Sequence, residues 1–213
     1  MEDFVIKTLV VGQLQTNCYL IIDKKVKKAL IIDPGDDADY IIRILADEKV
    51  TPLKIIATHG HFDHILGVTE LKLNFNIPFL INQKDLFLVK DMVKRTKYYL
   101  PDVTPIPPNI DKFLVNDEVI DFGNNQIRII ETPGHTPGSI CLYSAKQNIL
   151  FSGDTIFAGG GVGRTDFSYS SSIDLQKSLK KIFKLPGITT IYPGHGETST
   201  IKQEYEFFRK GLP

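Results

Sequence analysis

Three histidines and a carboxylate lie within six residues of this chain: His59, His61, Asp63 and His64. The other two of its five histidines, His135 and His195, each follow a Pro-Gly pair. Imidazole and carboxylate groups are the usual ligands of zinc and other first-row metals. Unrelated surface or core histidines would not be expected to cluster in this way, so the distribution predicts a metal site.

Four short apolar runs end just before a candidate ligand. Residues 53–57, 126–131, 148–152 and 188–192 come before His59, His135, Asp154 and His195, respectively. Runs of this length and composition are typical of buried strands. The glycines and prolines that follow them permit sharp turns. We therefore expect the ligands to meet in loops at one edge of a rigid sheet layer.

The remaining pattern predicts further strands at 4–11, 18–22, 29–32, 77–81, 118–122 and 139–144. Helical periodicity predicts helices at 37–50, 83–95, 171–183 and 200–209. Four prolines fall within residues 101–108, which predicts a loop between two halves. Each half runs strands, then a helix, then a strand carrying ligands. The expected fold is α/β (α+β), with two sheets inside and helices outside. We expect one domain over 1–213 with pseudo-repeated halves at roughly 1–110 and 111–213.

Composition narrows the range of partners. The chain of 213 residues carries 25 basic and 25 acidic side chains, and this balance argues against a nucleic-acid partner. No apolar run approaches 18 residues and no secretory leader is recognisable, so we expect a cytoplasmic protein without a membrane partner. Cys18 and Cys141 lie inside apolar runs and are interpreted as small buried hydrophobic residues, not as a disulfide or a nucleophile.

The ligand motifs together resemble a known family, the metallo-β-lactamase superfamily and, within it, the short glyoxalase II-like (hydroxyacylglutathione hydrolase-like) group. The resemblance covers nearly the whole chain. It rests on His59-x-His61-x-Asp63-His64, Pro133-Gly134-His135, Ser152-Gly153-Asp154, Pro193-Gly194-His195, Asn17-Cys18-Tyr19-Leu20, Ile32-Asp33-Pro34-Gly35 and Gly163-Arg164-Thr165-Asp166-Phe167.

The resemblance implies a four-layer αββα sandwich of two mixed sheets with a dinuclear metal site at one edge. By this resemblance, one ion would be bound by His59, His61 and His135. The other would be bound by Asp63, His64 and His195. Asp154 would bridge both ions, and a metal-bound hydroxide would be the nucleophile.

The chemistry of the ligand set agrees with two ions. Seven ligands are too many for one tetrahedral zinc, which takes four, or three plus a water when it is catalytic. Two divalent ions, zinc in the first place and iron or manganese as alternatives, would lower the pKa of a bound water to about 7. If Asp63 is not a ligand, it could instead act as a base.

The same ligand set sets the chain apart from other members of the superfamily. We expect true metallo-β-lactamases to carry a cysteine in place of Asp154 and to lack the Asp63-His64 pair. The diiron oxygen reductases that resemble this family have a glutamate where His61 stands. The nucleases of the superfamily look longer and more basic.

A thioester is the expected substrate, such as S-acylglutathione or another acylated small thiol. The chain offers no obvious acid to protonate an amine, and a thiolate leaves without one. A C-terminal glutathione-binding helical domain is not expected, because the chain ends about eighteen residues after His195. One alternative is a mononuclear iron persulfide dioxygenase using His59, His135 and Asp154. Lactone or ester hydrolysis and a non-catalytic binding module are further alternatives.

Two further residues remain open in role. Arg164 could bind a substrate carboxylate or form a salt bridge with Asp166. Asp33 could orient a ligating histidine or simply belong to a turn. The sequence does not distinguish a monomer from a homodimer.

Overall fold

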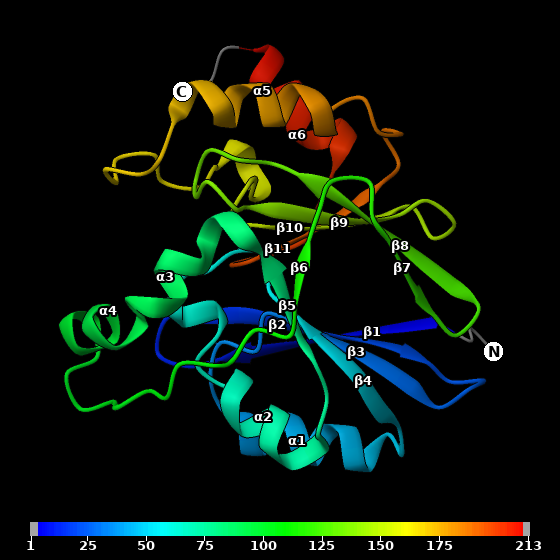
Figure 1. The fold of residues 1–213 in the computed structure, drawn as a ribbon. Coiled ribbons are helices and arrows are strands. Elements are labelled where there is room, and N and C mark those ends of the chain that lie inside the picture. Colours follow the sequence, from blue (N-terminus) through cyan, green and yellow to red (C-terminus); the bar gives the residue numbers. More distant parts are fainter. Residues whose placement is uncertain (1–3, 211–213) are drawn as a thin grey trace.

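The computed structural model describes residues 4–210 and consists of two sheets that face each other, with helices on both outer faces. Figure 1 shows the four layers: α1 and α2 cover one sheet, and α5 and α6 cover the other. The predicted αββα sandwich of two mixed sheets is confirmed.

The first sheet has the strand order β1-β2-β3-β4-β5-β6. Its strands are β1 (Phe4–Val11), β2 (Thr16–Asp23), β3 (Lys28–Ile32), β4 (Thr51–Ile56), β5 (Phe79–Asn82) and β6 (Lys112–Leu114). The first three strands form an antiparallel meander, whereas β3 to β6 pair in parallel. Parallel neighbours need a crossover connection, which α1 and α2 supply for β4 and β5.

The second sheet has the order β12-β11-β10-β9-β8-β7. Its strands are β7 (Val119–Phe122), β8 (Asn125–Glu131), β9 (Ile140–Ser144), β10 (Ile149–Gly153), β11 (Thr190–Pro193) and β12 (Ser199–Thr200). All neighbours are antiparallel except β10 and β11, which are connected through α5.

Four helices form the outer layers: α1 (Ala38–Asp47), α2 (Val68–Phe75), α5 (Ser172–Ile182) and α6 (Ile201–Arg209). Two others, α3 (Leu86–Lys90) and α4 (Met92–Tyr99), lie beyond one edge of the sheets, between the two helical layers (Figure 1). Short 3₁₀ turns occur at Phe62–His64, Gln83–Asp85 and Ala158–Gly160. In the described part of the chain, no helix has the length and apolar character needed to cross a membrane.

The core has three apolar layers, and β2 shows why. All eight of its residues are buried. Its alternate side chains point to opposite faces of the sheet, so Cys18 and Leu20 pack toward the helices while Tyr19 and Ile21 pack between the sheets. A third apolar layer, which includes Cys141, lies between the second sheet and α5 and α6. Both cysteines are free and buried, as predicted.

The structure differs from the predicted elements mainly around residues 83–99. A single helix over 83–95 was predicted, and this is wrong. The chain forms a 3₁₀ turn, then α3, and then α4 after a break at Asp91, whose φ of −86° and ψ of 0° fall outside helical values. Tyr98 and Tyr99 belong to the end of α4. Strands β6 and β12 were not predicted.

Candidate metal centre

All seven candidate ligands come together at one edge of the two sheets. β4, β8, β10 and β11 each end a few residues before a ligand. Thr16, at the start of β2, pairs with His195 through an isolated bridge that fixes the last ligand loop to the first sheet. The ligand atoms form overlapping sets within 4.8 Å of one another, as expected for coordinating groups.

The first donor group consists of His59, His61 and His135. Nδ1 of His61 lies 3.0 Å from Nε2 of His59 and 2.9 Å from Nε2 of His135. All three side chains are buried. One ring nitrogen cannot donate a proton to both neighbours at once. Three ring nitrogens that converge in this way form an arrangement that a shared cation would satisfy.

The second donor group consists of Asp63, His64 and His195. Oδ2 of Asp63 lies 3.7 Å from Nε2 of His64 and 3.5 Å from Nε2 of His195. Ligands about 2.1 Å from a tetrahedral ion are separated from each other by roughly 3.4 Å. The observed separations are therefore those expected of ligands around one ion.

Asp154 connects the two donor groups through its two oxygens. Oδ2 lies 3.5 Å from Nε2 of His135, and Oδ1 lies 3.6 Å from Nε2 of His64 and 3.8 Å from Nε2 of His195. Within residues 4–210, Oδ1 of Asp154 and Nε2 of His64 are buried and have no hydrogen-bond partner. Unpaired buried polar atoms are costly. Their position between carboxylates and imidazoles fits a centre for two metal ions.

The electrostatics of the two donor groups differ. Burial, followed by neighbouring imidazoles, holds the pKa of His59 and of His61 well below the usual range, so both rings are neutral and can act as ligands. Burial opposes protonation of His64 as well, but the carboxylates of Asp63, Asp154 and Asp33 together raise its pKa to about 10. The carboxylates around His64 therefore favour a positive charge at the second donor group.

Asp33 orients ligands of both donor groups through one carboxylate. Its Oδ2 accepts a hydrogen bond from Thr58 Oγ1 at 2.7 Å and lies 3.0 Å from Nδ1 of His64. Its Oδ1 accepts from the Thr58 backbone N–H at 2.7 Å. Oγ1 of Thr58 in turn lies 3.1 Å from Nδ1 of His59. The structure thus places Asp33 where it can fix the ring orientation of His64 directly and of His59 through Thr58.

The outward nitrogens of the other three histidines also have partners. His135 Nδ1 lies 2.9 Å from the carbonyl oxygen of Arg164, and His195 Nδ1 lies 3.3 Å from that of Gln15. Nε2 of His61 lies 2.9 Å from the hydroxyl of Tyr169. A carbonyl oxygen can only accept, so it keeps the proton on Nδ1 and leaves Nε2 of the same ring facing the centre.

Residues 11–195 match the protein family described as "Metallo-beta-lactamase superfamily". The chain belongs to this superfamily. "Hydroxyacylglutathione hydrolase GloC" of Haemophilus influenzae is 33% identical over 207 residues, which cover 93% of this chain and 94% of the relative. "Probable metallo-hydrolase YqgX" of Bacillus subtilis is 30% identical over 197 residues, covering 92% of each. With its His and Asp clusters, the chain is a metallo-hydrolase of the superfamily.

Two solved structures agree with the fold, and one of them is named as a di-iron-bound form. The chain is similar to the BLEG-1 B3 metallo-beta-lactamase, with a TM-score of 0.88, 34% identity and coverage of 95% of this chain and 97% of that one. It is also similar to TTHA1623 in a di-iron-bound form, with a TM-score of 0.84, 31% identity and coverage of 93% and 96%. The His and Asp clusters of this superfamily member are consistent with a binuclear site.

Asp85 was missed by sequence reasoning, although it fixes two of the ligand loops. Its carboxylate accepts hydrogen bonds from the backbone N–H groups of Gly60 at 2.8 Å and Gly138 at 2.7 Å, and from Thr136 Oγ1 at 2.7 Å. Gly60 separates His59 from His61. Asp85 is fully buried. One carboxylate therefore joins the loop after β4 to the loop after β8.

Two glycines are required by close approach to Asp154. A Cβ atom on Gly194 would lie 2.2 Å from Oδ1 of Asp154 and 2.8 Å from Cε1 of His64. A Cβ atom on Gly163 would lie 2.0 Å from the backbone oxygen of Asp154. No side chain fits at either place, so these glycines allow the ligand loops to pack against each other.

A cavity of about 370 Å³ opens directly onto the candidate centre. It is lined by ligands of both donor groups and by a mostly apolar wall: Leu14, Phe62, Tyr99, Phe157, Val162 and Phe167. Arg95 and Arg164 also line it. Arg164 is ion-paired with Asp166, donating from Nε at 3.0 Å and from Nη2 at 2.7 Å. The proposed salt bridge is thus present, and a role for Arg164 in substrate binding stays a prediction.

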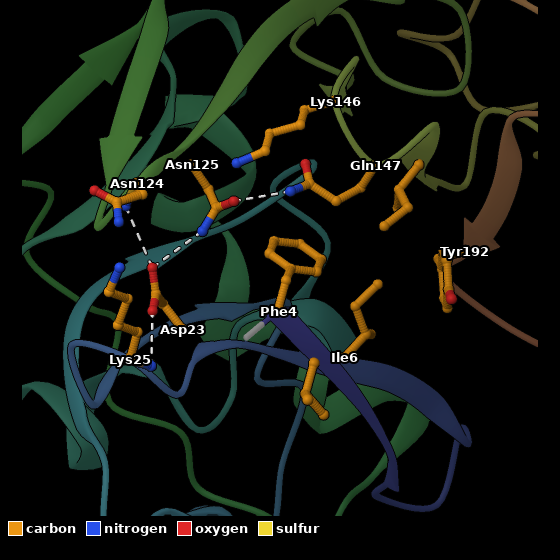
Figure 2. A pocket seen from close by; sticks show the side chains of 11 residues that line it. Phe4, Ile6, Asp23, Lys25, Asn124, Asn125, Lys146, Gln147 and Tyr192 are labelled. Atoms are coloured by element: carbon orange, nitrogen blue, oxygen red, sulfur yellow. Dashed lines mark hydrogen bonds between the residues drawn. The ribbon is translucent and has the colours of Figure 1, made fainter. Parts of the chain in front are cut away.

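A larger cavity, of about 840 Å³, contains none of the candidate ligands. Figure 2 shows it beside Phe4, Ile6 and Tyr192, with Asp23 hydrogen-bonded to neighbouring groups. The Asp23 carboxylate accepts from the backbone N–H groups of Lys25 and Asn124 and from the Asn125 amide. The carboxylate of Asp23 therefore already has partners within the protein. We assign the chemistry to the smaller cavity, where converging ligands and unpaired atoms occur together.

Proposed function

We propose that this metallo-hydrolase cleaves a thioester, such as S-acylglutathione or another acylated small thiol. The observation that carries the proposal is the division of seven ligands into two donor groups joined by Asp154. One ion would be held by the first donor group and one by the second, with Asp154 shared between them. Bound there, the ions would lower the pKa of a water and polarise the acyl carbonyl.

The protein's own contribution is positioning and exclusion of bulk water. Asp33, Thr58 and Tyr169 fix the orientation of ligand rings. Asp63 lies in the second donor group, within 3.7 Å of His64, and we propose that it acts as a ligand instead of a free base. The apolar wall of the cavity would hold an acyl chain and keep water away from the reacting carbonyl.

The lining of the cavity favours a leaving group that needs no proton. Apart from the candidate ligands, the polar side chains among the described lining residues are Arg95, Tyr99 and Arg164. Guanidinium and phenol side chains are poor proton donors at neutral pH. A thiolate, whose conjugate acid has a pKa of about 8.5, leaves without protonation. An amine leaving group, in contrast, has to be protonated as it leaves.

The relative from Haemophilus influenzae supports glutathione as a carrier. It is named as a hydroxyacylglutathione hydrolase, and the matched region covers 94% of its length. That relative therefore has little room for an additional C-terminal helical domain beyond the matched region. S-Acylglutathione accordingly belongs first in the set of substrates to be tested.

A second candidate is β-lactam hydrolysis. It is supported by the similarity to a structure named as a B3 metallo-beta-lactamase at 34% identity. That name runs against our expectation that Asp63, His64 and Asp154 would set this chain apart from true β-lactamases. Opening a lactam ring requires a proton for the leaving nitrogen, which the described lining residues do not readily provide. We therefore rank it below the thioester.

The test combines metal content with a substrate panel. Protein purified without added metal, and protein loaded with zinc, iron or manganese, would be assayed with S-acylglutathiones, small S-acyl thiols, a lactone and a β-lactam. We expect two ions per chain and fastest hydrolysis of a thioester. Tight binding of one ion with no thioester hydrolysis would overturn the proposal. Oxygen consumption with glutathione persulfide would indicate a dioxygenase instead.

A further inference from the structure

Arg95 is a cation at the candidate active site that the ligand motifs do not include. It lies on α4 (Met92–Tyr99) and lines the same cavity as His61, Asp63 and Asp154. Its side chain is 25% exposed, so most of the methylene stem is covered while part of the side chain reaches the solvent. This position brings a fixed positive charge to the wall of a largely apolar cavity.

The guanidinium of Arg95 is poorly paired within the protein. Its Nε is buried and has no hydrogen-bond partner among residues 4–210. The carboxylate of Asp91 lies 3.9 Å from Nε, beyond hydrogen-bond distance. An arginine has five N–H donors, and leaving buried ones unsatisfied is unfavourable. The guanidinium therefore has capacity for a further partner, and Arg95 lines the cavity.

One aromatic ring, that of Tyr169, holds Arg95 in place. Its guanidinium carbon lies 5.1 Å from the centre of the Tyr169 ring, within the range of a cation–π contact. Tyr169 in turn stacks on Phe167, with ring centres 5.3 Å apart, and its hydroxyl lies 2.9 Å from Nε2 of His61. Arg95 is therefore linked to the first donor group through a single side chain.

Arg164 provides a contrast within the same cavity. Two of its nitrogens donate to Asp166, so its fork is already occupied, and its side chain is 63% exposed. Of the two arginines that line the cavity, Arg95 is the one without a carboxylate at hydrogen-bond distance among the described residues, since its ion pair with Asp91 is 3.9 Å long.

We propose that Arg95 binds a carboxylate of the substrate, and that the preferred substrates are acyl thiols with a carboxylate near the thioester. The inference rests on the proposed thioester hydrolysis. A planar guanidinium matches the two oxygens of a carboxylate. The carboxylate can belong to the thiol or to the acyl group. In either case, binding to Arg95 directs the thioester toward the donor groups.

The experiment compares thioesters that carry a carboxylate with neutral thioesters. S-Acetyl-3-mercaptopropionate against S-acetyl-mercaptoethanol tests a carboxylate on the thiol. S-Succinyl-mercaptoethanol against S-butyryl-mercaptoethanol tests one on the acyl group. We expect Arg95→Met to lower kcat/KM for the preferred charged thioester about 10- to 100-fold, mainly through KM. For neutral thioesters, we expect a change below about 3-fold. Equal losses on charged and neutral thioesters, or no loss on either, would overturn the proposal.

Two variants separate binding from folding. Arg95→Lys keeps the charge but loses the fork, and it should recover part of the affinity for the charged thioester. Arg43→Met is the matched control, because the exposed Arg43 lies over the Tyr40 ring at 5.3 Å on α1. It should leave kcat/KM unchanged for both kinds of thioester. A loss in Arg43→Met equal to that in Arg95→Met would refute a specific role.

Binding of thioether analogues tests Arg95 without relying on hydrolysis. S-Propyl-3-mercaptopropionate and S-propyl-mercaptoethanol lack the reacting carbonyl and would be titrated into metal-loaded protein by calorimetry. If Arg95→Met loses binding of the charged thioether but keeps binding of the neutral one, the carboxylate site is supported. This holds even if no thioester is cleaved, and in that case only the proposed function fails. Thioester hydrolysis together with unchanged thioether binding in Arg95→Met would refute the carboxylate site and leave the proposed function standing.

Discussion

Asp33→Asn is expected to weaken metal binding at the second donor group selectively. In the wild type, Oδ2 of Asp33 is the common acceptor for Thr58 Oγ1 and for Nδ1 of His64. The amide of asparagine has one oxygen and one NH₂ group. In either orientation, the NH₂ group takes the place of one carboxylate oxygen. It then faces the N–H or O–H group from which that oxygen accepted a hydrogen bond. The substitution keeps the size of the side chain and replaces one of its two acceptor oxygens by a donor.

The size of the effect follows from the contacts that are lost. Asp33 and His64 are 1% and 0% exposed, so water cannot replace the missing acceptor. Loss of such a partner of a ligating histidine costs about 10- to 100-fold in metal affinity, or roughly 1.4–2.8 kcal/mol. Asp33 contacts His59 of the first donor group only indirectly, through the Thr58 hydroxyl. We therefore expect the loss at the first donor group to be the smaller of the two.

The assay is a two-site calorimetric titration of metal-depleted protein with zinc, with wild type and Asp33→Asn compared at the same pH. Asp121→Asn is a matched control, because Asp121 is exposed on β7 and accepts only from Gln126 among the described side chains. Circular dichroism of the metal-depleted proteins checks folding. Equal weakening of both sites, or unchanged binding at both, would refute our account of Asp33.

Three further predictions follow from the packing of the site. Gly194→Ala should lower hydrolysis about 100-fold or more, because the new Cβ displaces the Asp154 carboxylate; activity near the wild-type value would contradict the close approach. Asp85→Ala should lower the free energy of unfolding by about 3–5 kcal/mol in urea denaturation, since three buried donors lose their acceptor; a loss below about 1 kcal/mol would mean that the ligand loops do not depend on it. Cys18 and Cys141 should not react with a thiol reagent in the native protein, because burial raises both pKa values, that of Cys141 to about 11; rapid native labelling would contradict their burial.

The candidate ligand loops could be located from the sequence because a short apolar strand precedes each of them and because a glycine lies beside one candidate ligand in each: His59, His135, Asp154 and His195. These local signals determine where a strand ends and where a side chain can turn inward. The meander β1 to β3 and helices α1, α5 and α6 were also predictable from local signals, because each has a clear apolar pattern. Ser171 caps α5, because its side chain accepts a hydrogen bond from the backbone N–H of Asp174.

The supporting residues Asp85, Arg95 and Tyr169 could not be predicted in the same way. Asp85 contacts Gly60 and Gly138, which are 25 and 53 residues away in the sequence. Nothing in the neighbouring residues of Asp85 indicates a buried carboxylate. The break between α3 and α4, which places Arg95 beside the cavity, also lacks a glycine or proline signal. Such contacts depend on how the two sheets pack together.

The central claim, that two metal ions share Asp154 in a thioester hydrolase, is tested most directly by counting metal ions per chain in the active protein. Mass spectrometry of wild type and Asp154→Ala after equal metal loading would be combined with thioester hydrolysis by the same samples. We predict two ions per wild-type chain. In Asp154→Ala, we predict that at least one ion is lost and that hydrolysis is lost as well. Full activity with a single ion, or an Asp154→Ala protein that retains two ions and hydrolyses normally, would contradict the account.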